Sequence, residues 1–216
     1  MQMIEKWSTV ERVNHWLLLI GITTAIITGL PLYDVAAFGF LSALRQLRLP
    51  FGITIHLIGA TLILVAAIIH VVYRATTRRP TEIMFGLKDI KDLTTIGLHW
   101  FGLSKEYPKL GLHHPGQKMI YWGAAVAGVA LAGASGFLLW VPEVAPSLHT
   151  FAILAHDVAF VLILTLIAGH FILAITHPPC LTAMLVNGKM PVSFMQHHHP
   201  EWAERKGLLE KTAAPN

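Results

Sequence analysis

The sequence predicts an all-α integral membrane protein, a bundle of four transmembrane helices with both termini on the cytoplasmic side. Of its 216 residues, 54% are hydrophobic and only 13% are charged, which is too apolar for an ordinary soluble domain. Four apolar runs have about the length that crosses a bilayer, and basic residues are unevenly shared between their connections. The four runs are 16–33, 53–73, 119–141 and 151–175.

The topology follows from the Lys and Arg residues. Two precede the first run, eight lie between the second and third runs, and four lie in the tail, 176–216, whereas the opposite side has only Arg45 and Arg48. Cytoplasmic segments carry such an excess, so one membrane domain, 1–216, is expected with a cytoplasmic tail. The net charge of +4 reflects this asymmetry, and no nucleic-acid binding is predicted.

The first run is read as a retained span rather than a cleaved signal peptide, because charges of both signs precede it and no small-residue cleavage site follows. His15 lies at its cytoplasmic end beside Trp16. It can be a ligand or simply an interfacial histidine, and the sequence leaves both open. Gly21 and Gly29 share roughly one face, where either a neighbouring helix or a flat cofactor could come close.

The second run has His56 near its outer end and His70 near its inner end, fourteen residues apart. For His56, and for His156 of the fourth run, the alternative to a ligand role is that a backbone carbonyl satisfies the ring. The connection to the third run ends in Gly111-Leu112-His113-His114-Pro115-Gly116-Gln117-Lys118. The third run contains four glycines and no histidine, so we expect it to pack closely against other helices and to enclose a cofactor without ligating it.

The fourth run repeats the spacing of fourteen with His156 and His170. Fourteen helical steps end about 40° short of a full turn and about 21 Å further along, so both imidazoles share one face at two depths. An ionisable side chain is costly inside a bilayer, so an intramembrane histidine suggests a functional role. Imidazole is a standard axial ligand of haem iron. We therefore expect two b-type haems in series. His56 can meet His156 at the outer level, while His15 and His70 compete for His170.

Cysteine and histidine elsewhere narrow the chemistry. The single cysteine, Cys180, excludes an internal disulfide and a four-thiolate iron-sulfur cluster. No Cys-x-x-Cys-His occurs, so any haem is bound non-covalently. Three successive histidines, 197–199, could suggest a metal site, but neighbouring side chains of an extended segment alternate in direction. We expect a polar cytoplasmic contact surface there.

The chain resembles the cytochrome b (gamma) subunit of respiratory membrane-bound formate dehydrogenases, within a wider group that includes the membrane cytochromes b of nickel-iron hydrogenases. The resemblance extends over nearly the whole chain and includes the His156/His170 pair. The other matching segments are Glu11-Arg12-Val13-Asn14-His15-Trp16, His56-Leu57-Ile58-Gly59, Gly116-Gln117-Lys118-Met119-Ile120-Tyr121-Trp122, Ser135-Gly136-Phe137-Leu138-Leu139-Trp140 and His198-His199-Pro200-Glu201-Trp202.

The resemblance implies axial iron ligands for two haems b. The outer haem is held by His56 with His156 and the inner haem by His15 with His170, which leaves His70 as an additional histidine. A quinone site is implied beside the inner haem, at His114, Gly116 and Gln117. The family pattern has an asparagine where His114 stands, which bears on quinone type and proton chemistry.

The implied function is electron transfer in the bacterial cytoplasmic (inner) membrane. Electrons come from an iron-sulfur subunit on the outer side, which is joined to the catalytic subunit of a formate dehydrogenase, and cross two haems to a quinone near the cytoplasmic face. No residue here oxidises formate. His114, His113 and His70 are the proton-relay candidates, because histidine titrates near neutral pH.

Three alternatives to this function stay open. The chain can be the cytochrome b subunit of a nickel-iron hydrogenase, a stand-alone di-haem quinone oxidoreductase, or a membrane scaffold without redox chemistry. The neighbouring subunits separate the first two from a formate dehydrogenase, and absorption by haem separates the last.

Overall fold

The computed structural model describes residues 2–30, 52–77 and 82–208. Two compact units are present in the described chain: one comprises 2–7, 82–123 and 169–208, and the other comprises 8–30, 52–77 and 124–168. The end of the first apolar run and the connection that carries Arg45 and Arg48 lie outside the described residues. That 1–216 acts as one membrane domain stays a prediction.

The predicted membrane helices are confirmed as four helices that are long and apolar enough to cross a bilayer within the described chain. They are α1 (Thr9–Gly29), α3 (Gly52–Thr77), a continuous helix from Pro115 to Trp140, and α7 (Pro146–Thr176). The third consists of α5 (Pro115–Ile120), the π-helical η3 (Tyr121–Gly128) and α6 (Val129–Trp140). Many large apolar side chains on these helices are exposed in the isolated chain, as expected of a lipid-facing surface.

Helix α1 begins seven residues before the first apolar run, because its polar first turn is capped. Ser8 Oγ accepts the backbone N–H of Glu11, and the Glu11 carboxylate accepts the N–H of Ser8 at 2.9 Å. This reciprocal capping box satisfies backbone donors that have no partner inside the helix. The Ser8 hydroxyl also lies 2.8 Å from the Tyr73 hydroxyl of α3, which ties the cap to the neighbouring helix.

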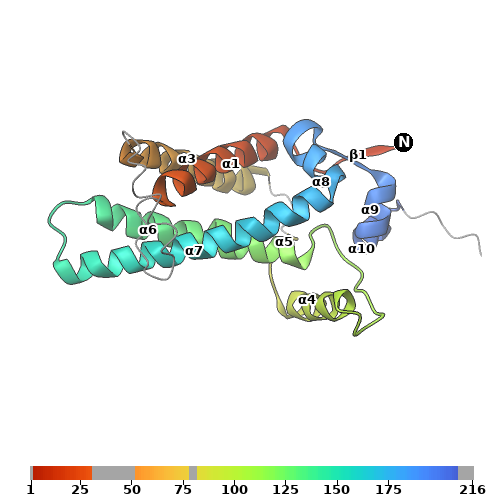
Figure 1. Ribbon diagram of the computed structural model, residues 1–216. Coiled ribbons are helices and arrows are strands. Elements are labelled where there is room, and N and C mark those ends of the chain that lie inside the picture. Colours follow the sequence, from red (N-terminus) through yellow and green to blue (C-terminus); the bar gives the residue numbers. More distant parts are fainter. Residues whose placement is uncertain (1, 31–51, 78–81, 209–216) are drawn as a thin grey trace, which may run out of the picture. The chain divides into compact units, whose positions relative to one another are not determined.

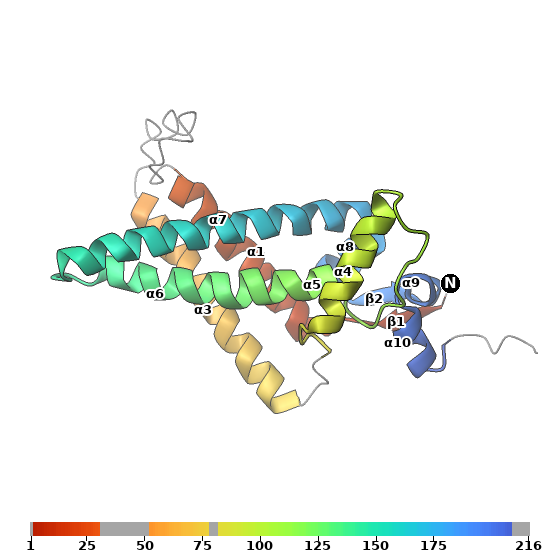
Figure 2. The same cartoon turned by 90° about the horizontal axis from the view of Figure 1, so that it is seen from below.

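Helices α1 and α3 lie side by side (Figure 1), and two glycines set their distance. A Cβ atom on Gly21 would be 2.9 Å from the Gly59 carbonyl oxygen, and one on Gly59 would be 2.9 Å from the Gly21 oxygen. The sequence left open whether Gly21 faces a neighbouring helix or a flat cofactor, and in the structure it faces the helix α3. Helix α6 and residues 146–168 of α7 form a second hairpin in the same unit (Figures 1 and 2).

The other unit contains a small two-stranded sheet and short helices. Strand β1 (Met3–Glu5) pairs antiparallel with β2 (Lys189–Pro191), so that Ile4 is opposite Met190. Met190 and Trp202 belong to a buried apolar cluster. Besides α5 and the end of α7, this unit contains α4 (Leu87–Trp100), α8 (Pro178–Thr182), the π-helical η4 (Ala183–Asn187), α9 (Val192–His198) and α10 (Pro200–Arg205).

His199 corrects the expectation of a polar contact surface in the tail. Its residue is only 4% exposed. Nδ1–H donates to the Gly111 carbonyl oxygen at 2.6 Å, and the Lys6 ammonium lies 3.5 Å from Nε2. Burial, followed by the charge of Lys6, lowers the pKa of His199 to about 3. His199 is therefore a neutral internal histidine that joins three distant segments of the chain.

Candidate functional site

His56 on α3 is held by two groups of α1. Its Nδ1 atom lies 3.1 Å from the Ala25 carbonyl oxygen and 3.2 Å from the Thr28 hydroxyl. A carbonyl oxygen can only accept a hydrogen bond, so Nδ1 carries the proton. The Thr28 hydroxyl donates its own hydrogen to the Thr24 carbonyl oxygen at 2.6 Å, which leaves its oxygen to accept from Nδ1. The Nε2 atom of His56 then keeps its lone pair for a metal.

His156 on α7 is held in the same way by α6. Its Nδ1 atom lies 3.1 Å from both the Ala132 carbonyl oxygen and the Ser135 hydroxyl. Ser135 in turn donates to the Leu131 carbonyl oxygen at 2.6 Å. His156 is consequently also the Nδ1–H tautomer, with the lone pair on Nε2. The backbone carbonyls that were the alternative to a ligand role are present, but they occupy only the nitrogen that a metal does not need.

A glycine lies against each of these imidazoles. A Cβ atom on Gly29 would be 3.3 Å from Cε1 of His56, and one on Gly136 would be 3.2 Å from Cε1 of His156. Gly29 thus makes room for a side chain of the adjacent helix. The expectation of close helix packing in the third run holds for Gly136 but fails for Gly133, where a Cβ atom would meet nothing within 4 Å.

The imidazoles of His56 and His156 lie close to each other. Their ring centroids are 6.2 Å apart and their planes are inclined by 62°. Two rings on opposite sides of one metal ion, with metal–nitrogen bonds of about 2 Å and ring radii of about 1.1 Å, have centroids about 6 Å apart. Donor type, tautomer and separation therefore fit a haem whose iron would be held by both histidines.

The inner-level candidates belong to different units. His15 on α1 and His70 on α3 are in the unit that contains His56, whereas His170 on α7 is in the other. The pairing of His170 therefore stays a prediction. Next to His15, the Oδ1 atom of Asn14 is buried and has no hydrogen-bond partner among the described residues, which marks this end of α1 as a polar site inside an apolar helix.

The predicted quinone segment is the N-terminus of the third membrane helix. His114 Nδ1 accepts the Gly116 N–H at 3.0 Å, and Gln117 Oε1 accepts the His114 N–H at 3.1 Å. His114 is thus the N-cap of α5, with its proton on Nε2. Asparagine is a preferred N-cap residue, so the asparagine that the resemblance implies for this position is compatible with the same cap. Burial, and then His177, lowers the pKa of His114.

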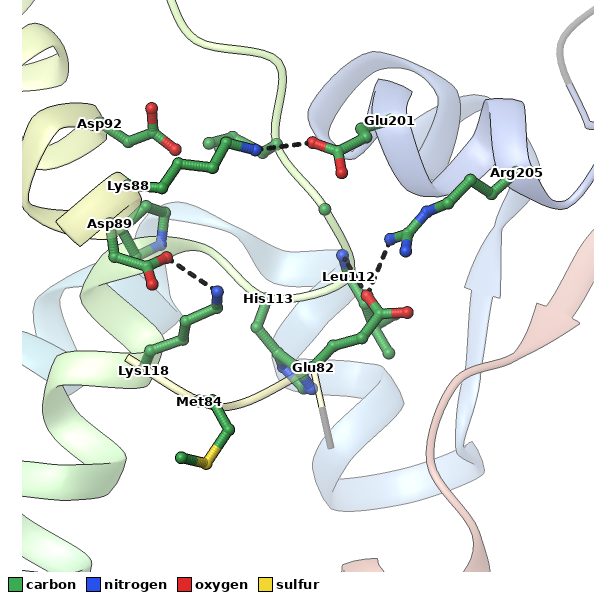
Figure 3. Close-up of a pocket in the computed structure, with 13 residues that line it drawn as sticks. Glu82, Met84, Lys88, Asp89, Asp92, Leu112, His113, Lys118, Glu201 and Arg205 are labelled. Carbon is green, nitrogen blue, oxygen red and sulfur yellow. Dashed lines mark hydrogen bonds and ion pairs between the residues drawn. The ribbon is translucent and has the colours of Figure 1, made fainter. Parts of the chain in front are cut away.

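A charged cavity of about 260 Å³ adjoins this cap (Figure 3). The residues that line it form three ion pairs: Asp89–Lys118 at 2.8 Å, Lys88–Glu201 at 2.9 Å and Glu82–Arg205 at 3.0 Å. His113 and Pro115, the two neighbours of His114 in the sequence, line it. The cavity brings polar groups and room for water to the start of the third membrane helix.

Comparison with known proteins now identifies the family. A family model described as prokaryotic cytochrome b561 matches residues 6–187, which is most of the chain. The chain belongs to the prokaryotic cytochrome b561 family. The cytochrome b556(fdo) subunits of formate dehydrogenase from Escherichia coli strains K12, O6:H1 (CFT073) and O157:H7 are each 25% identical to it over 215 residues, covering 97% of both chains.

The family membership and the four helices of membrane-spanning length together show that the protein is a membrane electron-transfer cytochrome of the b type. The resemblance inferred from the motifs is confirmed at this level. Within this b561-family cytochrome, the sequence interpretation missed Thr28, Ser135 and the Asp89–Lys118 pair. A signal for the first two was available, because Ala-x-x-(Thr/Ser)-Gly occurs at both 25–29 and 132–136. The ion pair could not be predicted in this way, because its two residues are 29 positions apart in the sequence.

Proposed function

We propose that the chain is the di-haem membrane subunit of a formate dehydrogenase, which passes electrons from an iron-sulfur partner on the outer side to a quinone near the cytoplasmic face. The proposal rests mainly on the proximity of His56 and His156. Their ring centroids are 6.2 Å apart, and the Nδ1 atom of each ring carries the proton. Haem supplies reversible one-electron transfer when bound there.

The outer site would be held by His56 and His156, one from each helical hairpin. Each histidine ring is held by its own hairpin through Nδ1, which leaves Nε2 for the iron. With both histidines bound, the haem would have no position left for oxygen, which suits electron transfer. The Ala-x-x-(Thr/Ser)-Gly segments exclude water from the Nδ1 side of both rings, because Thr28 and Ser135 are only 5% and 3% exposed.

The inner site would be held by His15 and His170. His170 lies fourteen residues after His156 on α7, which is about 21 Å along a helix axis, so one helix would present a ligand at each level. His70 would then contribute to the surroundings of the inner haem or to proton transfer. The membership of the family supports b-type haem, and the count of two rests on these two levels.

The quinone would be reduced beside the inner site, at the segment that contains His114, Gly116 and Gln117. Its reduction takes two electrons and two protons and yields the quinol. The charged cavity lined by His113 offers protons a polar approach to this segment. Uptake from the side opposite the electron donor charges the membrane, and each charge moved is worth about 2.3 kcal/mol per 100 mV.

The donor would be an iron-sulfur subunit attached to a catalytic subunit. The relatives are named as formate dehydrogenase cytochrome subunits, and the single cysteine of this chain cannot hold a cluster of its own. The expected location is the inner membrane with both termini cytoplasmic, as the distribution of basic residues supports.

The test is haem content and low-spin EPR of the complex purified with its partners, comparing His56→Ala, His156→Ala, His15→Ala and His70→Ala. We expect two low-spin haems in the wild type, the same one lost in the first two variants, and the other lost with His15→Ala. Loss with His70→Ala instead would move the inner ligand to α3. A wild-type protein without haem would refute the proposal.

The donor is tested by the electron source. Formate-dependent reduction of both haems in native membranes, abolished when the partner subunits are deleted, is the expected outcome. Reduction by hydrogen but not by formate would place the chain with the nickel-iron hydrogenases. Reduction by quinol in a chain that purifies alone would favour a stand-alone oxidoreductase.

A further inference from the structure

The two helical hairpins of one unit repeat the same arrangement around their histidines. In each, an alanine carbonyl and a hydroxyl three residues later contact one imidazole Nδ1, and the next residue is a glycine against Cε1. The first hairpin uses Ala25, Thr28 and Gly29, and the second uses Ala132, Ser135 and Gly136. The outer histidine pair therefore has two matched supports rather than two unrelated environments.

We propose that Thr28 and Ser135 are positioning residues that orient the His56 and His156 imidazoles and set the reduction potential of the haem between them. The inference rests on the proposed function, since it assumes one haem at this pair. It assigns a role to two buried hydroxyl groups that contact Nδ1 rather than the nitrogen left for iron, and it makes the two hydroxyls act on the same redox centre.

The direction of the two hydroxyls is fixed by their own donors. Thr28 Oγ1 gives its hydrogen to the Thr24 carbonyl at 2.6 Å, and Ser135 Oγ gives its hydrogen to the Leu131 carbonyl at 2.6 Å. Each oxygen is then restricted to accepting from the imidazole. Nδ1–H is shared between a carbonyl and a hydroxyl oxygen at 3.1–3.2 Å on the first hairpin and at 3.1 Å for both on the second.

Accepting from Nδ1–H strengthens the electron donation from Nε2 to a metal. Stronger donation favours the oxidised iron over the reduced iron, so each hydroxyl lowers the reduction potential. Removing one hydroxyl leaves the alanine carbonyl in place, which keeps the tautomer and the haem. The potential should therefore rise while coordination stays bis-histidine.

The experiment is spectroelectrochemical titration of the purified complex carrying Thr28→Val, Ser135→Ala or both. We expect one of the two midpoint potentials to rise in each single variant, the same haem to respond in both, and the double variant to rise further. The expected change is up to about tenfold in the ratio of reduced to oxidised haem, and tenfold corresponds to about 59 mV for a one-electron couple.

Two controls separate positioning from a general effect on the helices. Thr61→Val removes a hydroxyl of α3 that donates to the Leu57 carbonyl of its own helix at 2.8 Å, and it should move neither potential. Thr28→Ser restores the acceptor and should return the potential to the wild-type value. The EPR spectrum should remain low-spin throughout.

The inference is overturned if both potentials stay unchanged, if Thr61→Val shifts them equally, or if Thr28 and Ser135 act on different haems. Should Thr28→Val fail to assemble, Ser135→Ala alone decides, since it tests the same relation on the other hairpin. A wild-type complex without haem would instead refute the proposed function, so the two failures are distinguishable.

Discussion

Gly136 lies so close to His156 that a Cβ atom on it would be 3.2 Å from the imidazole Cε1. This distance is tighter than ordinary van der Waals contact, and the ring has little freedom to withdraw because its Nδ1 is bonded to α6. The same relation holds between Gly29 and His56 at 3.3 Å. Only glycine at these two positions leaves enough space for the imidazoles in their observed positions.

Gly136→Ala should displace the His156 ring and weaken haem binding, because iron coordination tolerates little misplacement of a ligand. We expect a lower ratio of haem to protein, with about a tenfold faster transfer of haem to an acceptor protein. Gly133→Ala, three residues earlier on the same helix, is the matched control, since nothing lies within 4 Å of its Cβ position. Equal haem retention in the two variants would contradict this account.

Lys118→Met should loosen the start of the third membrane helix. It leaves the Asp89 carboxylate, in a residue only 6% exposed, without its ion-pair partner, and breaking a buried pair from one side costs about 3 kcal/mol. Hydrogen exchange of the α4 and α5 amides would measure the loss. Lys88→Met is the control, because the Lys88 and Glu201 side chains are 67% and 37% exposed and such pairs contribute less than about 1 kcal/mol.

His114 can be tested as a helix cap and as a proton carrier by two substitutions. His114→Asn keeps a side-chain acceptor for the Gly116 N–H, whereas His114→Ala removes it at a cost of about 1 kcal/mol. From the cap we expect faster hydrogen exchange at 115–118 in the alanine variant only. Quinol formation that survives in the asparagine variant would leave capping as the function of His114, and its loss with intact haems would establish proton transfer there.

The unit that contains His199 should lose stability in acid. The folded-state pKa of about 3 lies below the ordinary value of about 6.5, so the unfolded chain binds the proton more strongly between these values. Stability is therefore complete above about pH 7 and falls as the pH drops from about 6.5 toward 3. His114, whose pKa is also lowered by burial, adds to the same trend.

The acid effect is measured by limited proteolysis of the tail between pH 7.5 and 4.5 in detergent. His199→Asn removes the titrating group and keeps an N–H donor for the Gly111 carbonyl. The variant should be cleaved at a rate that changes less with pH than that of the wild type. The same pH dependence in both proteins would show that another group controls the loss of stability.

The membrane helices could be predicted because apolar run length is a local property of the sequence. The four runs and the four candidate spans agree, and the differences at the ends arise from caps such as Ser8 with Glu11, which extend a helix beyond its apolar part. The spacing of fourteen also put His56 and His156 at one level, and the structure brings their rings together. That they ligate haem stays a prediction.

The supports of these histidines could not be read from the apolar pattern. Thr28 and Ser135 look like ordinary small polar residues of a membrane helix, and only the adjacent helix shows what they accept. His199 was misjudged because its partners, Gly111 and Lys6, are distant in the sequence. Burial of a polar residue depends on such distant contacts, which local composition does not contain.

The pairing of β1 with β2 has a consequence for biosynthesis. Residues 3–5 pair with residues 189–191, so the strand 3–5 is translated well before its partner and its backbone stays unpaired in the meantime. This non-local pairing is intrinsically slow and can form only after the four apolar helices have been translated. We expect a nascent chain that stops before residue 189 to expose the strand 3–5 to proteases, and a chain that includes both strands to protect it.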